Sequence, residues 1–142
     1  DLFDKHKVRF KGNVPESLYT FLSPFPSKIP CDNIECCLYD KGKLVAVGFL
    51  DIGKRATSCV YTIFDTDYER RSLGIFMILV QIQYSLAKGM THVYHGYVYR
   101  ETSAYDYKKN FYGLESYDWI LGQWQPYVRG HGGKPVSNDH RI

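Results

Sequence analysis

The stretch that decides the fold is residues 61–84, YTIFDTDYERRSLGIFMILVQIQY. Its first four residues are apolar and aromatic, as in a buried strand. A polar turn follows over 65–71, and Ser72-Leu73-Gly74 then opens a long apolar helix. A strand that runs through such a turn into a helix places free backbone N–H groups and the positive helix end at the carboxyl edge of the sheet. We expect a ligand to bind at that edge.

The whole chain fits one globular domain. It has 142 residues, and 44% of them are hydrophobic, which is enough for one sizeable core. We expect a single domain over residues 1–127 and a mobile tail over 128–142, where Gly, Lys, Asn, Asp and His dominate. The net charge of +3 permits phosphate contacts without requiring a nucleic-acid partner.

Composition also predicts a cytoplasmic protein. The sequence has no apolar run of about 18 residues and no basic-then-apolar leader, so we expect neither a membrane span nor a signal peptide. The cysteines lack the paired Cys-x-x-Cys spacing of a zinc site, so we expect buried free thiols and no metal. They are Cys31, Cys36, Cys37 and Cys59.

Three strands are expected before the central helix. They cover residues 34–39, 44–50 and 58–64. Gly42 suits a tight hairpin turn between the first two, which makes the meander antiparallel. Upstream, residues 1–22 fit helical spacing, and the three prolines within 23–30 predict an extended or looped connection.

The central helix is predicted from about Glu69 to Lys88. Apolar residues form two strips along it, so we expect it to be largely buried. Gly89 suits the C-terminal cap. A strand over 91–99 and a polar aromatic segment over 105–112 follow.

This order of elements predicts an α+β fold, a mostly antiparallel sheet with a central buried helix. It resembles the acetyltransferase-like (GNAT) fold, whose members place an acyl donor at the strand-to-helix turn. A likeness at the level of the fold does not fix the chemistry.

Three blocks carry a more specific resemblance. The first is GKLVAVGFLD at 42–51, and the second is VYTIFDTDY at 60–68 followed by RSLG at 71–74. The third is YHGY at 94–97, with Asp106-Tyr107-Lys108 ten residues beyond its glycine. Together they resemble the C-terminal catalytic domain of the aminoacyl-tRNA protein transferases, the arginyl and bacterial leucyl enzymes that extend protein N-termini. The likeness covers roughly residues 34–125.

The resemblance implies transfer of an amino acid, of the arginine or leucine class, from aminoacyl-tRNA to the N-terminal α-amine of an acceptor, as in N-degron pathways. The acceptor would begin with Asp or Glu. No metal or organic cofactor is implied beyond the charged tRNA, and we expect a monomer with no membrane partner.

Two departures from the family pattern keep other functions open. Thr66 stands where the family has proline, and residues 102–105 differ from the segment that the family has before Tyr107. The family's cysteine-bearing N-terminal domain is also absent from the sequence. One alternative is therefore a non-catalytic module that binds tRNA or acidic N-termini. The other is an acyl-CoA-dependent N-acyltransferase, against which the bulky Phe76 argues, because a CoA-binding turn favours a small residue there.

The carboxylates of the turn are the leading candidates for catalysis. Asp65 and Asp67 are placed to pair with a donor ammonium or to receive the proton of the acceptor amine. Asp67 is equally suited to cap the following helix, so Asp65 is the preferred catalytic residue.

Further candidates bind the substrates. Arg70, Arg71 and Ser72, with the N–H groups of Leu73 and Gly74, are suited to a phosphate or the terminal ribose, although a solvated basic turn is nearly as good an interpretation. Tyr107 and Lys108 are assigned to the catalytic centre by the resemblance, with Lys108 facing an acidic acceptor residue. The tyrosines assigned to stacking of tRNA bases or other substrate contacts are Tyr61, Tyr97, Tyr99, Tyr107 and Tyr112. For His92 and His95 we expect structural roles.

Overall fold

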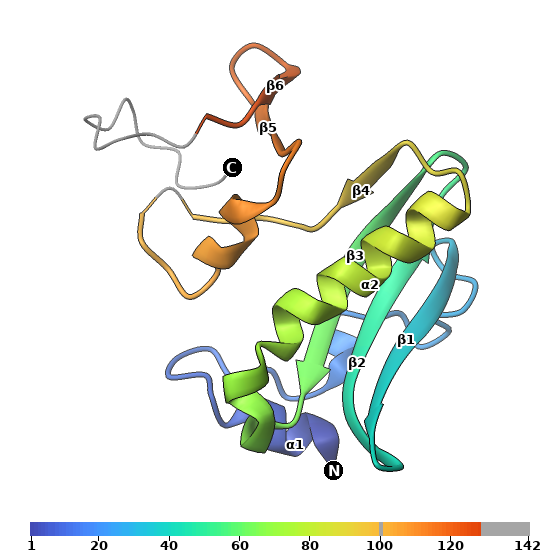
Figure 1. The fold of residues 1–142 in the computed structure, drawn as a ribbon, viewed down its shortest axis with the longest axis vertical. Helices are drawn as coiled ribbons and strands as arrows, with labels where there is room; N and C mark the ends of the chain where they lie inside the picture. The colour runs from blue at the N-terminus through green and yellow to red at the C-terminus, as the bar shows by residue number, and fades with distance from the viewer. Residues whose placement is uncertain (100, 129–142) are drawn as a thin grey trace. The chain divides into compact units, whose positions relative to one another are not determined.

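The computed structural model describes residues 1–99 and 101–128, drawn in colour in Figure 1. The chain divides after Gly96 into two compact units, Asp1–Gly96 and Tyr97–Ile142. The single domain expected over 1–127 stays a prediction. The expected tail falls on residues that, from 129 onward, lie outside the described part of the chain.

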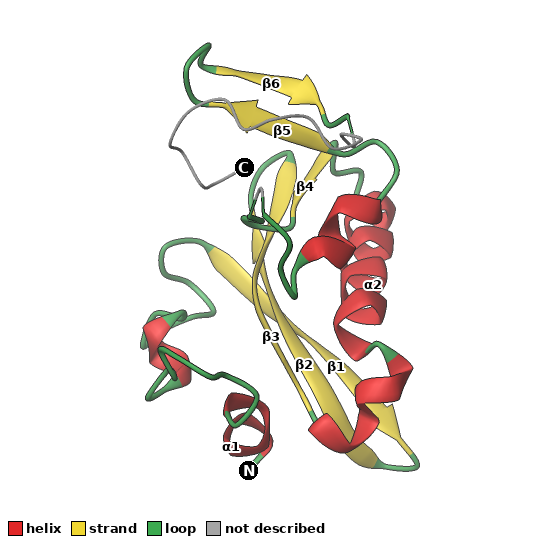
Figure 2. Ribbon diagram, turned by 90° about the vertical axis from the view of Figure 1, so that its left-hand side faces the viewer, coloured by secondary structure: helices red, strands yellow, loops and turns green. Residues whose placement is uncertain are grey.

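The first unit is built on a four-stranded sheet in the order β1–β2–β3–β4 (Figure 2). β1 pairs antiparallel with β2, and β2 with β3, as the sequence predicts. β4 pairs parallel with β3, which makes the sheet mixed but mostly antiparallel. The strands are β1 Asp32–Asp40, β2 Lys43–Ile52, β3 Ala56–Phe64 and β4 His92–Tyr94. The strand expected over 91–99 is therefore real but shorter than predicted.

The hairpin between β1 and β2 has the tight turn that Gly42 predicts. Lys41 and Gly42 both adopt positive φ angles, 48° and 83°, as a two-residue turn of the type I′ class requires. The turn brings Asp40 opposite Lys43. It therefore fixes the end of the hairpin at which the candidate site lies.

The two faces of the sheet are covered by different parts of the first unit (Figure 2). On one face lie α1 (Leu2–Lys7) and η1, a 3₁₀ turn (Leu18–Thr20). Their core includes Phe3 and Leu22, packed on sheet residues Val47, Phe49 and Ile63. On the other face lies α2 (Leu73–Ala87), whose Leu73 and Met77 pack on Val45 and Ala46.

The helix expected over 1–22 is much shorter than predicted. Asp1 and Asp4 form a reciprocal capping box at the start of α1, and the helix ends at Lys7. Gly12 and Pro15 then interrupt any continuation, since both are poor helix formers. The segment 23–30 contains no helix or strand, which confirms the expected loop.

The central helix begins four residues later than predicted. Residues Thr66–Arg71 form η2, a separate 3₁₀ turn, and α2 starts at Leu73. Ser72 separates the two with a left-handed backbone, φ 52° and ψ 44°, which no continuous right-handed helix contains. At the other end Gly89 has φ 71°, and its predicted capping role is confirmed.

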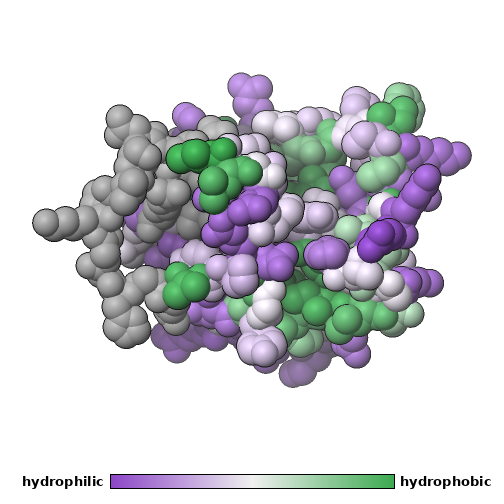
Figure 3. Space-filling view, turned by 90° about the horizontal axis from the view of Figure 1, so that it is seen from above, coloured by the Kyte–Doolittle hydropathy of each residue, from purple (hydrophilic) through white to green (hydrophobic). Residues whose placement is uncertain are grey.

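The prediction that this helix is largely buried is wrong. One face of α2 packs on the sheet, but Ile75, Phe76, Leu79 and Leu86 are exposed. Sequence periodicity revealed two apolar strips, and only one of them found a partner among the described residues. Figure 3 shows hydrophobic side chains among hydrophilic ones on the face of the molecule that it presents.

A buried polar seam joins α2 to β3. Thr57 Oγ1 and Ser85 Oγ lie 2.7 Å apart, and Ser85 Oγ donates to the carbonyl of Gln81 at 2.7 Å. Gly48 of β2 lies beneath Met77 and Gln81, where an added Cβ would come within 2.6 Å of the methionine side chain. A glycine at this position therefore lets α2 lie close to the sheet.

The second unit contains a 3₁₀ turn and a two-stranded antiparallel hairpin. These are η3 (Asp106–Asn110), β5 (Glu115–Asp118) and β6 (Gln123–Pro126). Asp118 Oδ1 accepts the N–H groups of Ile120 and Leu121, which orders the hairpin loop. The ring of Tyr117 makes edge-on contacts with Trp119 and Trp124.

The structure bears on two expectations from composition, buried cysteine thiols and the absence of a membrane span. None of the four cysteine thiols is buried, and Cys37 is exposed, so the expectation of buried thiols is wrong. Within the described residues, no helix combines the length and hydrophobicity needed to cross a membrane.

Candidate active site

Asp65 ends β3 and begins η2. Its backbone N–H donates to the carbonyl of Val45 at 2.8 Å, and its Oδ1 accepts the N–H of Asp67 at 3.1 Å. Asp65 is therefore the N-cap of η2, and the N-cap position of α2 is Ser72, so the cap of the following helix that was considered for Asp67 is wrong. Only 1% of Asp65 is exposed, whereas the Asp67 side chain is 68% exposed.

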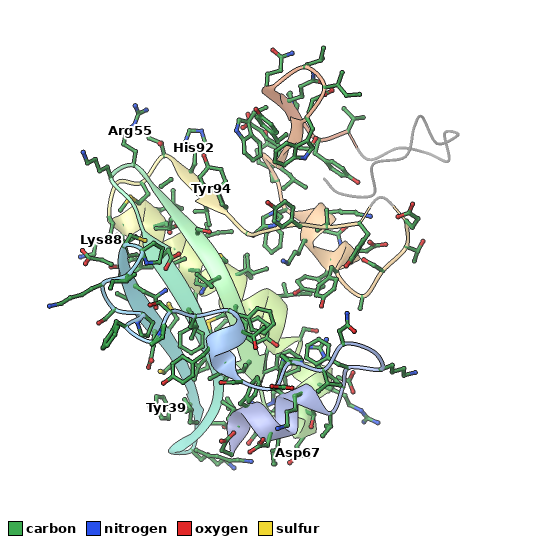
Figure 4. All side chains as sticks on the ribbon, turned by 180° about the vertical axis from the view of Figure 1, so that it is seen from behind. Tyr39, Arg55, Asp67, Lys88, His92 and Tyr94 are labelled. Carbon is green, nitrogen blue, oxygen red and sulfur yellow. The ribbon has the colours of Figure 1, made fainter. Side chains whose placement is uncertain are left out.

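Two lysines from distant parts of the chain converge on this carboxylate. Lys43 Nζ, at the start of β2, lies 2.7 Å from Asp65 Oδ2. Lys5 Nζ, from α1, lies 3.2 Å from each Asp65 oxygen and 2.8 Å from Asp67 Oδ2. One ammonium thus bridges both aspartates of the turn (Figure 4 labels Asp67 beside α1).

These contacts set the protonation of the cluster. The hydrogen bond from Lys43 lowers the pKa of Asp65 to about 2, against the opposing effect of burial. The pKa of Lys5 is raised, first by its hydrogen bond to Asp67 and then by that to Asp65. The hydrogen bond to Asp65 likewise raises the pKa of Lys43. At neutral pH the cluster therefore holds an ionised Asp65 between two ammonium groups.

A second group of charges joins η2 to the hairpin end. Arg71 Nη1 lies 3.7 Å from Asp40 Oδ2, and a hydrogen bond to Asp40 raises the pKa of Tyr68. The Tyr68 ring lies between two cations, Lys43 at 5.4 Å and Arg71 at 5.5 Å from its centroid. Arg71 is thus already paired, whereas exposed Arg70 makes no ion pair within residues 1–99 and 101–128.

The segment 72–74, predicted to bind phosphate or ribose, forms the N-terminal end of α2. Ser72 is exposed, and its carbonyl accepts the N–H groups of Ile75 and Phe76. Within the part of the chain that the structure describes, no side chain caps this helix end. Leu73 is buried in the core, and Gly74 is half-buried. The N-terminal end of α2 therefore carries its positive dipole without an acidic cap.

Tyr61 faces the N-terminal layer. Its ring stacks on Phe21 with centroids 4.1 Å apart and meets the His6 ring edge-on at 5.9 Å. These contacts place its ring in packing within the first unit. A role for Tyr61 in substrate binding stays a prediction.

The remaining predicted residues lie in the second unit. Tyr97, Tyr99 and Tyr112 are exposed, as an aromatic base-stacking role requires. Tyr107 and Lys108 lie in η3, and the Lys108 ammonium is 5.6 Å from the centroid of the Tyr105 ring. Their predicted roles are not tested by these positions.

His92 has a visible structural contact. Its Nδ1 lies 2.9 Å from Thr91 Oγ1, which donates to the carbonyl of Arg55 at 3.0 Å. This links the start of β4 to the β2–β3 turn, and Figure 4 labels Arg55 and His92 together at that end.

Sequence reasoning missed Lys5 and Lys43 as members of the site. Lys43 stands in the first family-like block, and Lys5 belongs to an N-terminal run of alternating basic residues. Neither signal identifies a carboxylate partner, because the contact of Lys5 with Asp65 spans 60 residues of sequence.

His6 was also missed. It is 2% exposed, and its Nδ1 accepts the N–H of Phe64 at 3.1 Å. That bond requires the proton on Nε2 of a neutral ring. Burial lowers the pKa of His6 to about 4, with a smaller contribution from Arg9. His6 thereby anchors α1, and with it Lys5, to the end of β3.

Comparison with known proteins shows the family to which this geometry belongs. The family model described as "Arginine-tRNA-protein transferase, C terminus" matches residues 1–118, which include both the aspartate turn and the two lysines. The chain belongs to this family.

Curated relatives of this chain carry the name aspartate/glutamate leucyltransferase. One from Stenotrophomonas maltophilia (strain K279a) is 43% identical over 76 residues, 54% of this chain and 30% of that protein. One from Xanthomonas campestris pv. campestris (strain B100) is 42% identical over 77 residues, 54% and 31% of the two chains. One from Acinetobacter baumannii is 38% identical over 88 residues, 62% and 32%. The matched region spans about a third of the length of these relatives.

Proposed function

We propose that this chain transfers an amino acid from aminoacyl-tRNA to the N-terminal α-amine of an acceptor polypeptide. Membership of the transferase family supports this reaction, and the name of the relatives, aspartate/glutamate leucyltransferase, supports leucine as the amino acid and Asp or Glu as the acceptor residue. Charged tRNA is then the only co-substrate, without a metal or organic cofactor. We place the reaction in the cytoplasm, carried out by a monomer.

The observation that carries the proposal is the Lys5 ammonium held between Asp65 and Asp67. Both substrates of the reaction carry an α-ammonium group, and the same oxygens that hold Lys5 Nζ suit such a group. With Lys5 in place, two ammonium groups balance the two carboxylates. When the half-exposed Lys5 side chain swings away, one net negative charge remains to attract a substrate ammonium.

In this proposal the two aspartates have different tasks. With a pKa of about 2, Asp65 is a weak proton acceptor at neutral pH, so it acts as a fixed anion that aligns Lys43 and the incoming ammonium. Because Asp67 is exposed, it is better placed than Asp65 to accept a hydrogen bond from the attacking amine. An α-amine has a pKa of about 8, so part of it is already neutral, and positioning supplies much of the rate.

The chemical step forms one bond and breaks one. The amine nitrogen attacks the ester carbonyl, the new C–N amide bond forms, and the C–O bond to the tRNA ribose breaks. The proton lost by the amine passes to the ribose oxygen that leaves. During the transfer, the Asp67 carboxylate accepts this proton from the amine and passes it to the ribose oxygen.

The other predicted residues complete the proposal. Exposed Arg70 and the start of α2 at Ser72, Leu73 and Gly74 bind the phosphate or ribose of the tRNA end. Arg71, held by Asp40, orients Tyr68 and contributes to the same positive surface. Tyr107 and Lys108 bind the acidic acceptor residue. Tyr61, Tyr97, Tyr99 and Tyr112 contact the substrates or stack on unpaired bases.

A GNAT-like fold is part of the proposal. β3 continues to Phe64, but its pairing with β4 ends at Ser58 opposite Tyr94. Among the described residues, no strand covers the rest of that β3 edge. An open edge beside the start of the following helix is where acyl donors bind in such folds.

The test is a transfer assay with the purified chain. Leucyl-tRNA and arginyl-tRNA, each labelled in the amino acid, are incubated with peptides that differ only in their first residue: Asp, Glu or Gly. We expect label from leucyl-tRNA on the Asp and Glu peptides and none on the Gly peptide. Failure with both tRNAs, while the chain still binds them, would identify a non-catalytic binding module. Transfer from acetyl-CoA instead would identify an acyl-CoA enzyme.

A further inference from the structure

A small pocket lies on the N-terminal face of the sheet, away from the aspartate turn. The proline-containing loop over 23–30 covers the β1–β2 end and leaves a cavity of about 30 Å³. Its lining includes the apolar residues Phe21, Leu22, Ile29 and Val60. Three polar side chains, Ser23, Asn33 and Asp51, share the wall.

The Asp51 carboxylate is half-buried and hydrogen-bonded to a neighbouring side chain. Asn33 Nδ2 donates to its Oδ1 at 2.8 Å, which fixes the orientation of the carboxylate. Asp51 also contributes, after burial, to raising the pKa of the nearby Cys31 thiol. Among residues 1–99 and 101–128, no lysine, arginine or histidine nitrogen lies within 4.0 Å of Asp51.

This arrangement contrasts with Asp65, which has two lysines. A half-buried carboxylate that lines a pocket accepts a charge-assisted hydrogen bond from a cation that enters the pocket. The chemistry that fits is a primary ammonium on an apolar stem.

The size of the pocket selects the kind of stem. A cavity of this volume holds about two water-sized groups, which matches an ammonium and the methylene that carries it. A planar guanidinium or the branched end of leucine is wider. We propose that the pocket binds the end of a lysine side chain of a polypeptide, with its ammonium on Asp51 and its methylenes against Phe21 and Val60.

The spacing along the sheet suggests which polypeptide carries that lysine. Val45, whose carbonyl accepts the Asp65 N–H, and Asp51 lie on the same strand, about 20 Å apart at strand geometry. About six extended residues span that distance. An acceptor with its N-terminus at the aspartate turn therefore places its seventh residue near the pocket. This assignment to the acceptor rests on the proposed function; the ammonium site itself does not.

Binding is tested first, without the reaction. The side-chain NH₂ signals of Asn33 are followed by NMR while N-acetyl-lysine methylamide is added at pH 7. Two probes control for its parts: the norleucine analogue keeps the stem without the charge, and leucinamide carries only an α-ammonium. We expect saturable shifts with the lysine probe alone. Equal shifts with the norleucine analogue would overturn the proposal. Stronger shifts with leucinamide would also overturn it, because they would assign the pocket to the α-ammonium of an amino acid.

Two matched variants locate the charge. Asp51→Asn keeps the shape of the side chain and should weaken binding of the lysine probe at least about tenfold, because a hydrogen bond to a charged group is lost. Asp32→Asn removes an exposed carboxylate on the same sheet edge and should leave binding unchanged. Thermal unfolding of both variants checks that they fold. Equal loss in a folded Asp32→Asn variant would show a diffuse charge effect and refute the site.

The acceptor assignment is tested with peptides that begin with Asp and carry one lysine at position 3, 7 or 11. If transfer occurs, lysine at position 7 should lower KM with little change in kcat, and Asp51→Asn should abolish the difference. Equal KM values for the three peptides would refute the acceptor assignment. An absence of transfer to all peptides contradicts the proposed function, while the NMR result still decides the lysine site.

Discussion

Lys5 Nζ lies 2.8 Å from Asp67 Oδ2 and 3.2 Å from both carboxylate oxygens of Asp65. Its helix is anchored next to that turn by His6, whose ring accepts the N–H of Phe64. The N-terminal segment therefore completes the site at the end of β3 and is not merely packed against the sheet.

Replacing Lys5 with methionine should strengthen substrate binding. The variant removes the ammonium that competes for Asp67, so the affinity for leucinamide, a mimic of the donor ammonium, should rise several-fold in a calorimetric titration. Lys7→Met is the matched control, because Lys7 lies on the same helix and pairs with Asp4 instead. Weaker binding to Lys5→Met than to Lys7→Met would show that Lys5 assists binding rather than competing with it.

Substitutions of Asp65 separate its cap from its charge. Asp65→Asn keeps a side-chain acceptor for the Asp67 N–H, whereas Asp65→Ala loses it, at a cost of about 1 kcal/mol for an N-cap. Both leave Lys43 without its anion. We expect Asp65→Ala to have the lower midpoint in urea unfolding and both variants to lose transfer. Transfer by a folded Asp65→Asn variant at the wild-type rate would remove the charge of Asp65 from the mechanism.

Stability should fall in mildly acidic solution because of His6. Its pKa is about 4 in the folded protein and 6.5 without the fold, so the unfolded chain binds the proton at a higher pH. Folding therefore loses stability as the pH drops from 6.5 towards 4 and gains none above 6.5. Asp65 affects the stability at lower pH, because its pKa falls from the ordinary value of 3.8 to about 2 in the folded protein. Urea unfolding from pH 4 to 8 measures this, and His6→Gln should flatten the profile while exposed His92→Gln leaves it unchanged.

Gly48→Ala should destabilise the first unit. Its Cβ would lie 2.6 Å from Met77 Cγ and Sδ and 2.8 Å from Gln81 Nε2, and both side chains are fully buried. Overpacking of this kind costs about 1–3 kcal/mol. Gly12→Ala is the control, because nothing lies within 4 Å of its added Cβ. Urea unfolding should separate the two, and equal midpoints would show that α2 moves away from β2 without cost.

Gln81→Leu should leave stability unchanged or raise it. Gln81 is fully buried, and neither of its amide atoms makes a hydrogen bond within the described residues. Replacing an unsatisfied buried amide by an apolar group of similar size removes a desolvation cost. Thermal unfolding measures the change, with Ser85→Ala as the contrast, because Ser85 has two hydrogen-bonding contacts to lose. A clear drop in the midpoint of Gln81→Leu would show that the amide is stabilised in place.

The local pattern of the sequence was sufficient for the strands and the hairpin. Alternation and β-branched residues placed β1 to β3 within two residues at each end, and Gly42 located the turn. The family-like blocks were also local, and the family was confirmed over residues 1–118. Local pattern failed at Ser72, where a residue of ordinary helix propensity takes a left-handed backbone and delays the start of α2.

The sequence by itself therefore determined that a strand, a turn and a helix follow one another over 61–84, because those choices follow from neighbours in the chain, but it did not determine that α2 starts only at Leu73. The tertiary structure alone decided that Asp65 is the buried cap, that Lys5 and Lys43 neutralise it, and that one apolar strip of α2 stays exposed. These outcomes depend on contacts between residues far apart in sequence, and the strength of an ion pair depends on burial that only packing creates.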